Sequence, residues 1–303
     1  MGGKTKVLLV GPTSQFCPVA TRHCPAYATY GNSRPVKVAI LEMPVARKRL
    51  RELVNSQPPA TPLLPLTHTT DVYGLINALD DQELVPHSCD VFVGEPLLYF
   101  FYGRPSYRVN SNQPPTSLDH YLPVCLLFRS ASTFPIKRIF PFDTGGFEKD
   151  LYADALHKDM KLEDFGLDPD PSTPGKVISL FFGTVDAYLR ARPLSALKLD
   201  PKELEAISFH ALISSRLSNN VDNRSSGVEI QLEGRLDLRG NIEAIILPGP
   251  LLESQQISAK LSQGGIVPLP YPQIDRQRPS EYVTKIFDLC YEYYSRVGPL
   301  NVS

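Results

Sequence analysis

The order in which short apolar segments follow one another constrains the fold of this chain most. Strand-like and helical segments come in groups: one strand and a short helix, then several strands, a long helical stretch, and strands again. The expected strands cover residues 63–68, 91–93, 97–101, 121–128, 136–142, 228–232 and 242–247. Such grouping predicts an α+β fold with a mainly antiparallel sheet, and not an alternating βαβ arrangement.

Helices are expected where apolar residues recur at helical spacing. Thr69 is placed to cap a short helix that follows the first strand. Further helices are expected over residues 177–190, from 200–203 to about 216, and over 280–296.

Residues 1–62 look unlike the rest of the chain. They hold two possible short strands, 6–10 and 36–41, and a possible helix, 46–54. The stretch Ser-Gln-Pro-Pro-Ala-Thr-Pro at 56–62 predicts an extended linker, because proline disfavours helix at the residue before it. We therefore expect a poorly defined segment over 1–62 and a compact domain over 63–303.

Composition limits the classes of protein to which the chain can belong. Of its 303 residues 42% are hydrophobic, so a sizeable core can form, and the formal net charge of −1 gives no bulk electrostatic reason to bind a polyanion. The five cysteines are scattered without a C-x-x-C pair, which predicts reduced thiols, a cytoplasmic location and no metal site. No stretch approaches the roughly 20 apolar residues of a membrane span, so no membrane partner is expected.

Three segments carry side chains suited to chemistry. The first reads Leu-Thr-His-Thr at 66–69 and ends a strand just before a helix. From such a fixed position His68, with Thr69 beside it, could bond a ribose hydroxyl. The alternative is a partly buried histidine whose hydrogen bonds are satisfied within the protein.

The second segment reads Leu-Leu-Tyr-Phe-Phe-Tyr-Gly-Arg-Pro-Ser-Tyr-Arg at 97–108. An aromatic side chain such as Tyr99 or Tyr102 can stack on a flat heterocycle, and the Arg104 guanidinium can hold a phosphate or orient a ribose. The alternative is a buried aromatic strand with a structural arginine.

The third segment reads Asn-Arg-Ser-Ser-Gly-Val-Glu-Ile-Gln at 223–231. Its carboxylate, Glu229, lies between two apolar neighbours, where burial without a partner would be costly. Alternation offers another explanation, since Glu229 and Gln231 could both face solvent on a half-exposed strand.

In this order the three segments resemble the ADP-ribosyltransferase fold, in particular its DarT-like branch. The first strand of that family ends in His-Thr before a helix, as at His68. A later strand of the type Tyr-Phe-x-x-Arg corresponds to residues 99–105, here with one residue more before Arg104, and the strand with the catalytic glutamate corresponds to 224–230. The resemblance covers about residues 63–250 and implies a split, mainly antiparallel sheet with a helical insertion at 145–217.

The resemblance also implies a mechanism, with NAD as the substrate in a cleft between the halves of the split sheet. The implied roles are a ribose contact for His68 and Thr69, stacking on nicotinamide for Tyr99 or Tyr102, a pyrophosphate or acceptor contact for Arg104, and the catalytic carboxylate for Glu229. A carboxylate suits this chemistry because positive charge builds on the ribose as nicotinamide leaves.

The implied activity is transfer of ADP-ribose to a nucleic acid or a protein, in a toxin or phage-defence setting with a cognate antitoxin or regulator. Two alternatives stay open: NAD hydrolysis with water as acceptor, and a non-catalytic binding module of the same fold. A nuclease that uses His120 beside Asp119, or Asp143 with Glu148, is disfavoured because no second cluster of metal ligands accompanies these residues.

Overall fold

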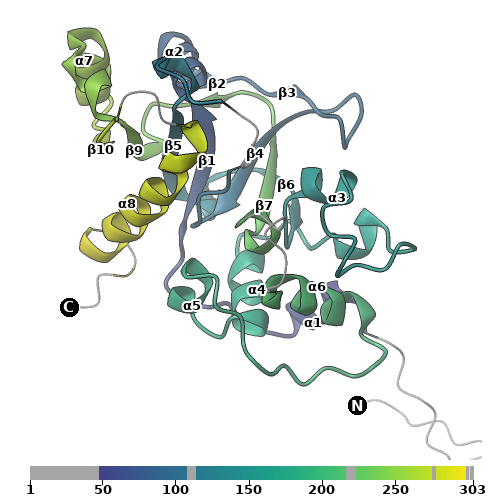
Figure 1. Cartoon of the computed structure of the whole chain (residues 1–303). Coiled ribbons are helices and arrows are strands. Elements are labelled where there is room, and N and C mark those ends of the chain that lie inside the picture. The colour runs from purple at the N-terminus through teal and green to yellow at the C-terminus, as the bar shows by residue number, and fades with distance from the viewer. Residues whose placement is uncertain (1–47, 108–113, 216–222, 275–277, 298–299, 301–303) are drawn as a thin grey trace, which may run out of the picture. The chain divides into compact units, whose positions relative to one another are not determined.

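The computed structural model describes residues 48–107, 114–215, 223–274, 278–297 and 300. These residues belong to a compact unit that begins at Lys48 (Figure 1). It has an α+β architecture built on one large, open and mostly antiparallel sheet, as the grouping of segments in the sequence predicts.

Eight strands form the large sheet, in the order β10-β9-β5-β1-β4-β7-β6 with β3 beside β4. Their bounds are β1 Pro65–Asp71, β3 His87–Ser88, β4 Pro96–Tyr102, β5 Pro123–Ser130, β6 Ile136–Phe140, β7 Glu229–Glu233, β9 Ile242–Pro248 and β10 Val267–Tyr271. Strands β9 and β10 are parallel, and the other neighbours are antiparallel. A small second sheet pairs β2 (Glu83–Leu84) with β8 (Leu236–Asp237).

Helices flank this sheet. Their bounds are α1 Leu50–Asn55, α2 Val72–Asp81, α3 Thr144–Glu148, α4 Thr173–Phe181, α5 Val185–Leu189, α6 Leu204–Ser214, α7 Gln255–Gln263 and α8 Val283–Arg296. Both α2 and α8 pack against the central strand β5, and α8 also contacts β9 and β10 (Figure 1). Residues 123–128 of β5 are all buried, as expected for a continuous apolar strand that is covered on both faces.

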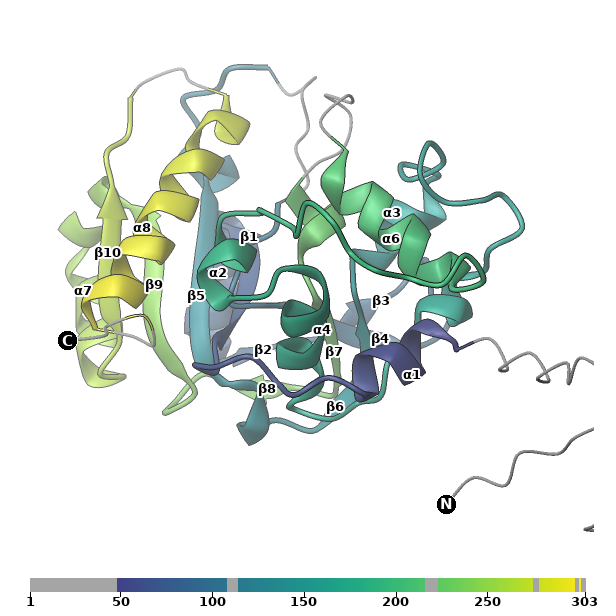
Figure 2. The same ribbon diagram turned by 90° about the horizontal axis from the view of Figure 1, so that it is seen from below.

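The helices α3 to α6 all lie between β6 and β7, in the region of the predicted insertion although α3 begins one residue before it, and they gather with α1 beside one part of the sheet (Figures 1 and 2). Aromatic rings fill the space among them. Phe142 lies 5.0 Å from Phe165 between ring centroids, and Phe181 lies 4.7 Å from Phe209. The insertion thus has an apolar centre of its own, next to the start of β7.

The sheet opens between β1 and β4. These strands are paired at Leu66–Tyr102 and Thr67–Phe101, whereas β1 follows β5 from Pro65–Ser130 to Asp71–Pro123. Beyond Thr67, therefore, β1 stays with β5 while β4 stays with β7.

Two local expectations are wrong. Residues 91–93 form no strand, and Val93 is 86% exposed. Thr69 does not cap α2, because pairing with β5 extends β1 to Asp71. The Asp71 side chain caps the helix instead, accepting a hydrogen bond from the Gly74 N–H at 2.8 Å.

Two helix boundaries also differ from the predictions. The stretch 177–190 is divided into α4 and α5 at Gly183, whose φ of +77° an L-residue rarely adopts. The Asp200 N–H does bond the Glu203 carboxylate, at 2.9 Å, but this contact closes a turn before α6 begins at Leu204.

The compact unit starts earlier than the expected boundary at residue 62. Helix α1 buries Leu50, Leu53 and Val54 and packs on α4, and the Ala60 N–H donates to the Gly175 carbonyl at 2.9 Å. Apolar spacing within a short segment does not reveal a partner helix far away in the chain. The possible strands 6–10 and 36–41 lie outside the described residues.

Candidate functional site

Glu229 is the first residue of β7, and its side chain is completely buried. One carboxylate oxygen, Oε2, accepts a hydrogen bond from the Thr144 N–H at 2.9 Å. The other, Oε1, accepts from the Thr144 hydroxyl at 2.9 Å and from the Gln231 amide at 2.7 Å. Glu229 therefore faces the protein interior and not the solvent.

A second carboxylate lies near Glu229. Asp143 forms an ion pair with Arg224, 3.0 Å between Oδ2 and Nη1, and caps α3 by accepting from the Gly146 N–H at 2.6 Å. Burial and the nearby Asp143 charge raise the pKa of Glu229 to about 8. The hydrogen bonds from Thr144 and Gln231 favour the ionised form and lower this pKa, but their effect is smaller. At neutral pH most Glu229 carboxyls are therefore protonated, and strongly shifted carboxyls of this kind concentrate at functional sites.

The sheet register decides which predicted residues share a face with Glu229. Glu229 pairs with Phe101, and Phe101 pairs with Thr67, so these side chains lie on one face. Successive residues of a strand alternate between faces. His68 and Tyr102 therefore lie on the opposite face from Glu229.

Tyr99 and Thr69 share the face of Glu229. Tyr99 pairs with Gln231, and its hydroxyl bonds the Cys89 thiol. Burial raises the pKa of the Tyr99 hydroxyl, which stays neutral. The Thr69 hydroxyl donates to the Ser106 carbonyl at 2.7 Å and so holds the segment after β4 against this face.

His68 fills the opening between β1 and β4. Its Nδ1 lies 2.9 Å from the Tyr99 carbonyl and supplies a hydrogen bond where the strands have separated. Burial lowers the pKa of the His68 imidazole, so the ring is neutral with its proton on Nδ1. The geometry matches the alternative of a half-buried histidine bonded within the protein.

Tyr102 is 1% exposed and also has a role inside the fold. Its hydroxyl accepts a hydrogen bond from the Leu64 N–H at 2.9 Å, and its carbonyl accepts one from the Tyr188 hydroxyl at 2.8 Å. Burial raises the pKa of Tyr102. The structure thus separates His68 and Tyr102 from Glu229, because a side chain's face is set by its position in the strand.

Arg104 is a buried cation at the end of β4, 4% exposed. Its Nη1 donates to the Ser226 hydroxyl at 2.5 Å, and its guanidinium carbon lies 5.7 Å from the Phe287 ring centroid. In the described part of the chain no carboxylate pairs with Arg104, and its Nε has no hydrogen-bond partner. Burial lowers the pKa of Arg104, because an internal charge without an ionic partner is less stable than one in water.

Ser106 adds a second unsatisfied group beside the first. It is 2% exposed and its hydroxyl has no hydrogen-bond partner. A Cβ atom on Gly227 would lie 2.8 Å from this hydroxyl, so Ser106 abuts Gly227 just as Arg104 abuts Ser226. Arg104 and Ser106, each with a buried polar atom that has no partner, therefore lie against the two residues just before Val228 and β7.

Sequence reasoning missed the partners of Glu229 that come from distant segments. Thr144 and Asp143 were not assigned to the site, and Asp143 was considered only for a nuclease. The signal available was Glu229 itself, since a carboxylate in an apolar strand requires donors somewhere. The sequence does not say which donors these are.

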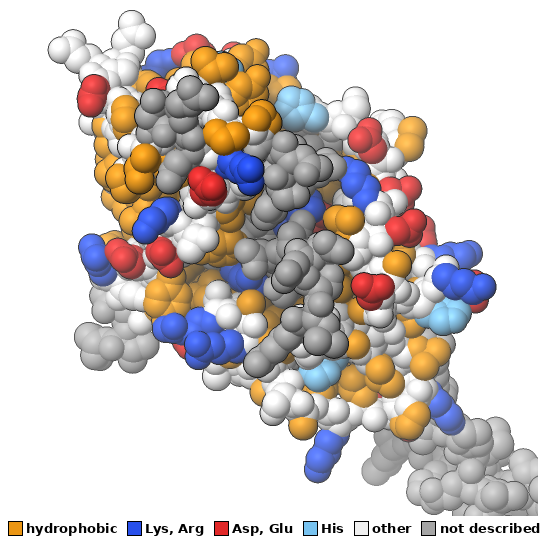
Figure 3. Space-filling view, in the orientation of Figure 1, with side chains coloured by type: hydrophobic (Ala, Val, Ile, Leu, Met, Phe, Trp, Pro, Cys, Tyr) orange, Lys and Arg blue, Asp and Glu red, His pale blue; other side chains and the backbone are white. Residues whose placement is uncertain are grey.

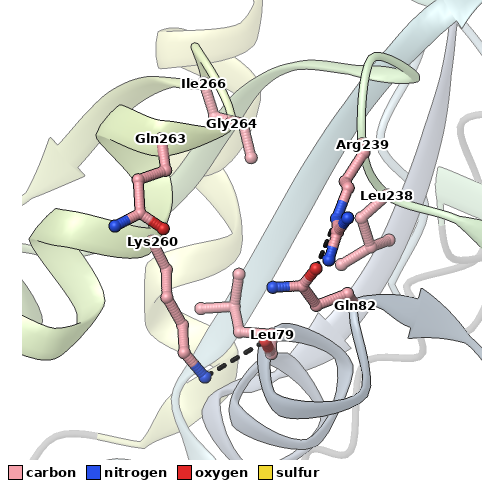
Figure 4. Close-up of a pocket in the computed structure, with 8 residues that line it drawn as sticks. All are labelled: Leu79, Gln82, Leu238, Arg239, Lys260, Gln263, Gly264 and Ile266. Atoms are coloured by element: carbon pink, nitrogen blue, oxygen red, sulfur yellow. Dashed lines mark hydrogen bonds between the residues drawn. The ribbon is translucent and has the colours of Figure 1, made fainter.

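An open hollow of about 370 Å³ lies elsewhere, between α2 and α7 (Figure 4). Its lining residues are Leu79, Gln82, Leu238, Arg239, Lys260, Gln263, Gly264 and Ile266. There, Lys260 bonds the Leu79 carbonyl and Arg239 bonds Gln82. None of the six predicted site residues lines this hollow.

The surface charges are mixed. On the face shown in Figure 3, Lys and Arg side chains lie among Asp and Glu side chains and not in one continuous patch. Among the described residues, no group of three or more His, Cys, Asp or Glu side chains is placed to hold a metal ion. Within the same ranges, no helix combines the length and apolar character that crossing a membrane requires. No protein-family model matches the chain, and no curated protein matches it.

Proposed function

We propose that this protein transfers ADP-ribose from NAD to a macromolecular acceptor, a nucleic acid or a protein, with release of nicotinamide. The observation that carries the proposal is the buried Arg104 guanidinium, which has an unsatisfied Nε and no carboxylate partner in the described residues. A buried cation calls for an anion, and the pyrophosphate of NAD is an anion that a guanidinium binds well.

The neighbouring carboxylate supports the same reaction. As the bond to nicotinamide breaks, the ribose carbon develops positive charge, and a fixed anion stabilises that charge more in the transition state than in the ground state. Glu229 lies on the strand next to β4 and on the face covered by the Arg104–Ser106 segment. In the proposed mechanism the ionised form of Glu229 acts, so turnover increases with pH toward about 8.

The proposed site differs from the one implied by the resemblance. Arg104 binds the pyrophosphate, Glu229 stabilises the ribose cation, and Tyr99 flanks the ring on the same face. Thr69 acts indirectly, through its bond to the Ser106 carbonyl. His68 and Tyr102 stabilise the fold and do not contact NAD.

The test is incubation of the full chain with NAD labelled in its adenylate half, together with nucleic acid and protein acceptors. Transfer predicts label on a macromolecule and release of nicotinamide, both at least about 100-fold slower in Glu229→Gln. Free ADP-ribose as the product would instead establish NAD hydrolysis. No nicotinamide release from the wild-type chain, over a pH series to 9, refutes both reactions.

A second candidate is non-catalytic binding of a dinucleotide. It is favoured by the complete burial of the Glu229 carboxylate, which makes three hydrogen bonds within the protein. Binding of ADP-ribose that depends on Arg104, without nicotinamide release from NAD, distinguishes this candidate from the transferase.

A further inference from the structure

The contact between Thr144 and Glu229 occupies both carboxylate oxygens. Thr144 is the first residue of α3, and it is as completely buried as Glu229. Its N–H donates to Oε2 and its hydroxyl to Oε1, both at 2.9 Å. These two residues are 85 positions apart, so the contact exists only because the insertion folds back onto β7.

The turn that carries Thr144 is docked as a unit. Besides its side-chain ion pair with Arg224, Asp143 donates its N–H to the Arg224 carbonyl at 3.1 Å. Phe147, one turn further on, stacks on Phe142 with parallel rings whose centroids are 5.9 Å apart. Lifting α3 from β7 would break both Asp143–Arg224 contacts together with the two bonds from Thr144, and would uncover Glu229.

The Thr144 hydroxyl makes the bond that a sugar hydroxyl would make. In the proposed reaction a ribose hydroxyl donates to the Glu229 carboxylate, and here an alcohol of the protein donates to the same oxygen at 2.9 Å. A ribose cannot enter while Thr144 is in place, since the carboxylate is completely buried.

We propose that the α3 turn is an autoinhibitory lid, in which Thr144 competes with the ribose of the nucleotide for the Glu229 carboxylate. The lid regulates the site of the proposed function. The inference rests on that function, because it identifies the nucleotide that would bind there. Binding then requires opening, so the apparent dissociation constant for nucleotide equals the intrinsic one divided by the fraction of molecules that are open.

The test compares Thr144→Val, which removes the hydroxyl at nearly constant shape, with Thr144→Ser, which keeps it. Thr184→Val serves as a matched control, because Thr184 is exposed and its hydroxyl caps α5 by accepting from the Ala187 N–H. The first measurement is modification of Glu229 by a water-soluble carbodiimide and an amine, followed by mass spectrometry of the peptide. The second is the affinity for ADP-ribose.

Thr144→Val is expected to raise the modification rate of Glu229 at least about tenfold and to tighten ADP-ribose binding by about 5- to 100-fold, the range of a typical coupling energy. Thr144→Ser and Thr184→Val are expected to stay within about twofold of wild type. Equal modification of Glu229 in wild type and Thr144→Val overturns the lid. If Glu229 is modified faster in Thr144→Val than in wild type but no variant binds ADP-ribose or consumes NAD, the lid stands and the proposed function is refuted.

If Thr144→Val does not fold, hydrogen exchange on the wild-type chain decides. ADP-ribose is expected to speed exchange at the Thr144 and Gly146 amides, which donate to Glu229 and Asp143 in the closed form. Exchange at these amides that ADP-ribose leaves unchanged or slows overturns the lid.

Discussion

Replacing Glu229 with glutamine removes a titrating proton from the protein interior while keeping the shape of the side chain. The Thr144 N–H can still donate to the amide oxygen, and the Thr144 hydroxyl can accept from the new amide nitrogen. Gln231 can turn its own amide to present an oxygen. We therefore expect the variant to fold, with a small offset in stability that does not depend on pH.

The pH-dependent part follows from the folded-state pKa of Glu229, about 8, against 4.5 for an exposed glutamate. Because the folded-state value is the higher one, the neutral carboxyl stabilises the fold fully below about pH 4.5, and this contribution is lost as the pH rises to about 8. A difference of about 3.5 in pKa corresponds to about 5 kcal/mol. Glutamine does not ionise and so does not lose this contribution. The free energy of unfolding of Glu229→Gln relative to that of wild type therefore increases between these two pH values.

The assay is urea unfolding of wild type and Glu229→Gln at pH 5, 7 and 9, with Glu233→Gln as the control. Glu233 ends the same strand but is 64% exposed. The free energy of unfolding of Glu229→Gln minus that of wild type should increase steadily from pH 5 to about pH 8 and then level off. A change in this difference of less than about 1 kcal/mol between pH 5 and 9 would refute the reasoning from the buried carboxyl. In the same protein, the proposed mechanism predicts a barrier at least about 3 kcal/mol higher, or about 100-fold slower nicotinamide release.

Three further substitutions separate the binding residues from the structural ones. Arg104→Met should weaken ADP-ribose binding about 10- to 100-fold by calorimetry, because about 1.5–3 kcal/mol of charged hydrogen bonding is lost, without lowering thermal stability. An unchanged affinity removes Arg104 from the site. His68→Leu should cost about 1–3 kcal/mol in urea unfolding, because the Tyr99 carbonyl loses its donor, and should leave NAD turnover within about threefold. Lost turnover at full stability would contradict this structural role. Gly103→Ala should destabilise by at least about 1 kcal/mol, since φ is +67° and the new Cβ would lie 2.3 Å from the Leu64 Cδ1. If Gly103→Ala unfolds in urea like wild type, the turn after β4 accommodates a Cβ atom and the prediction is wrong.

The sequence predicted those features that a short segment decides by itself. The apolar run of β5 required cover on both faces of the sheet, and the helical spacing of apolar residues in α8 required an apolar surface on which to pack. Glu229 also stood out locally, because a carboxylate among apolar neighbours requires either solvent or donors. The grouping of strands and helices predicted the α+β class and the mostly antiparallel sheet, since alternation with helices would favour parallel strands.

Tertiary structure decided everything that depends on register between distant strands. Alternation within β1 or β4 can be read from the sequence, but only the pairing of Thr67 with Phe101 and of Phe101 with Glu229 fixes which residues share a face. That pairing puts His68 on the far side of the sheet from Glu229. Gln231 donates to Glu229 from the same strand, but the other two donors belong to Thr144, 85 residues away, and these contacts become favourable only after the chain has folded. Local preferences therefore specified the strands, while the burial of one carboxylate and one guanidinium was determined by how those strands and the insertion pack together.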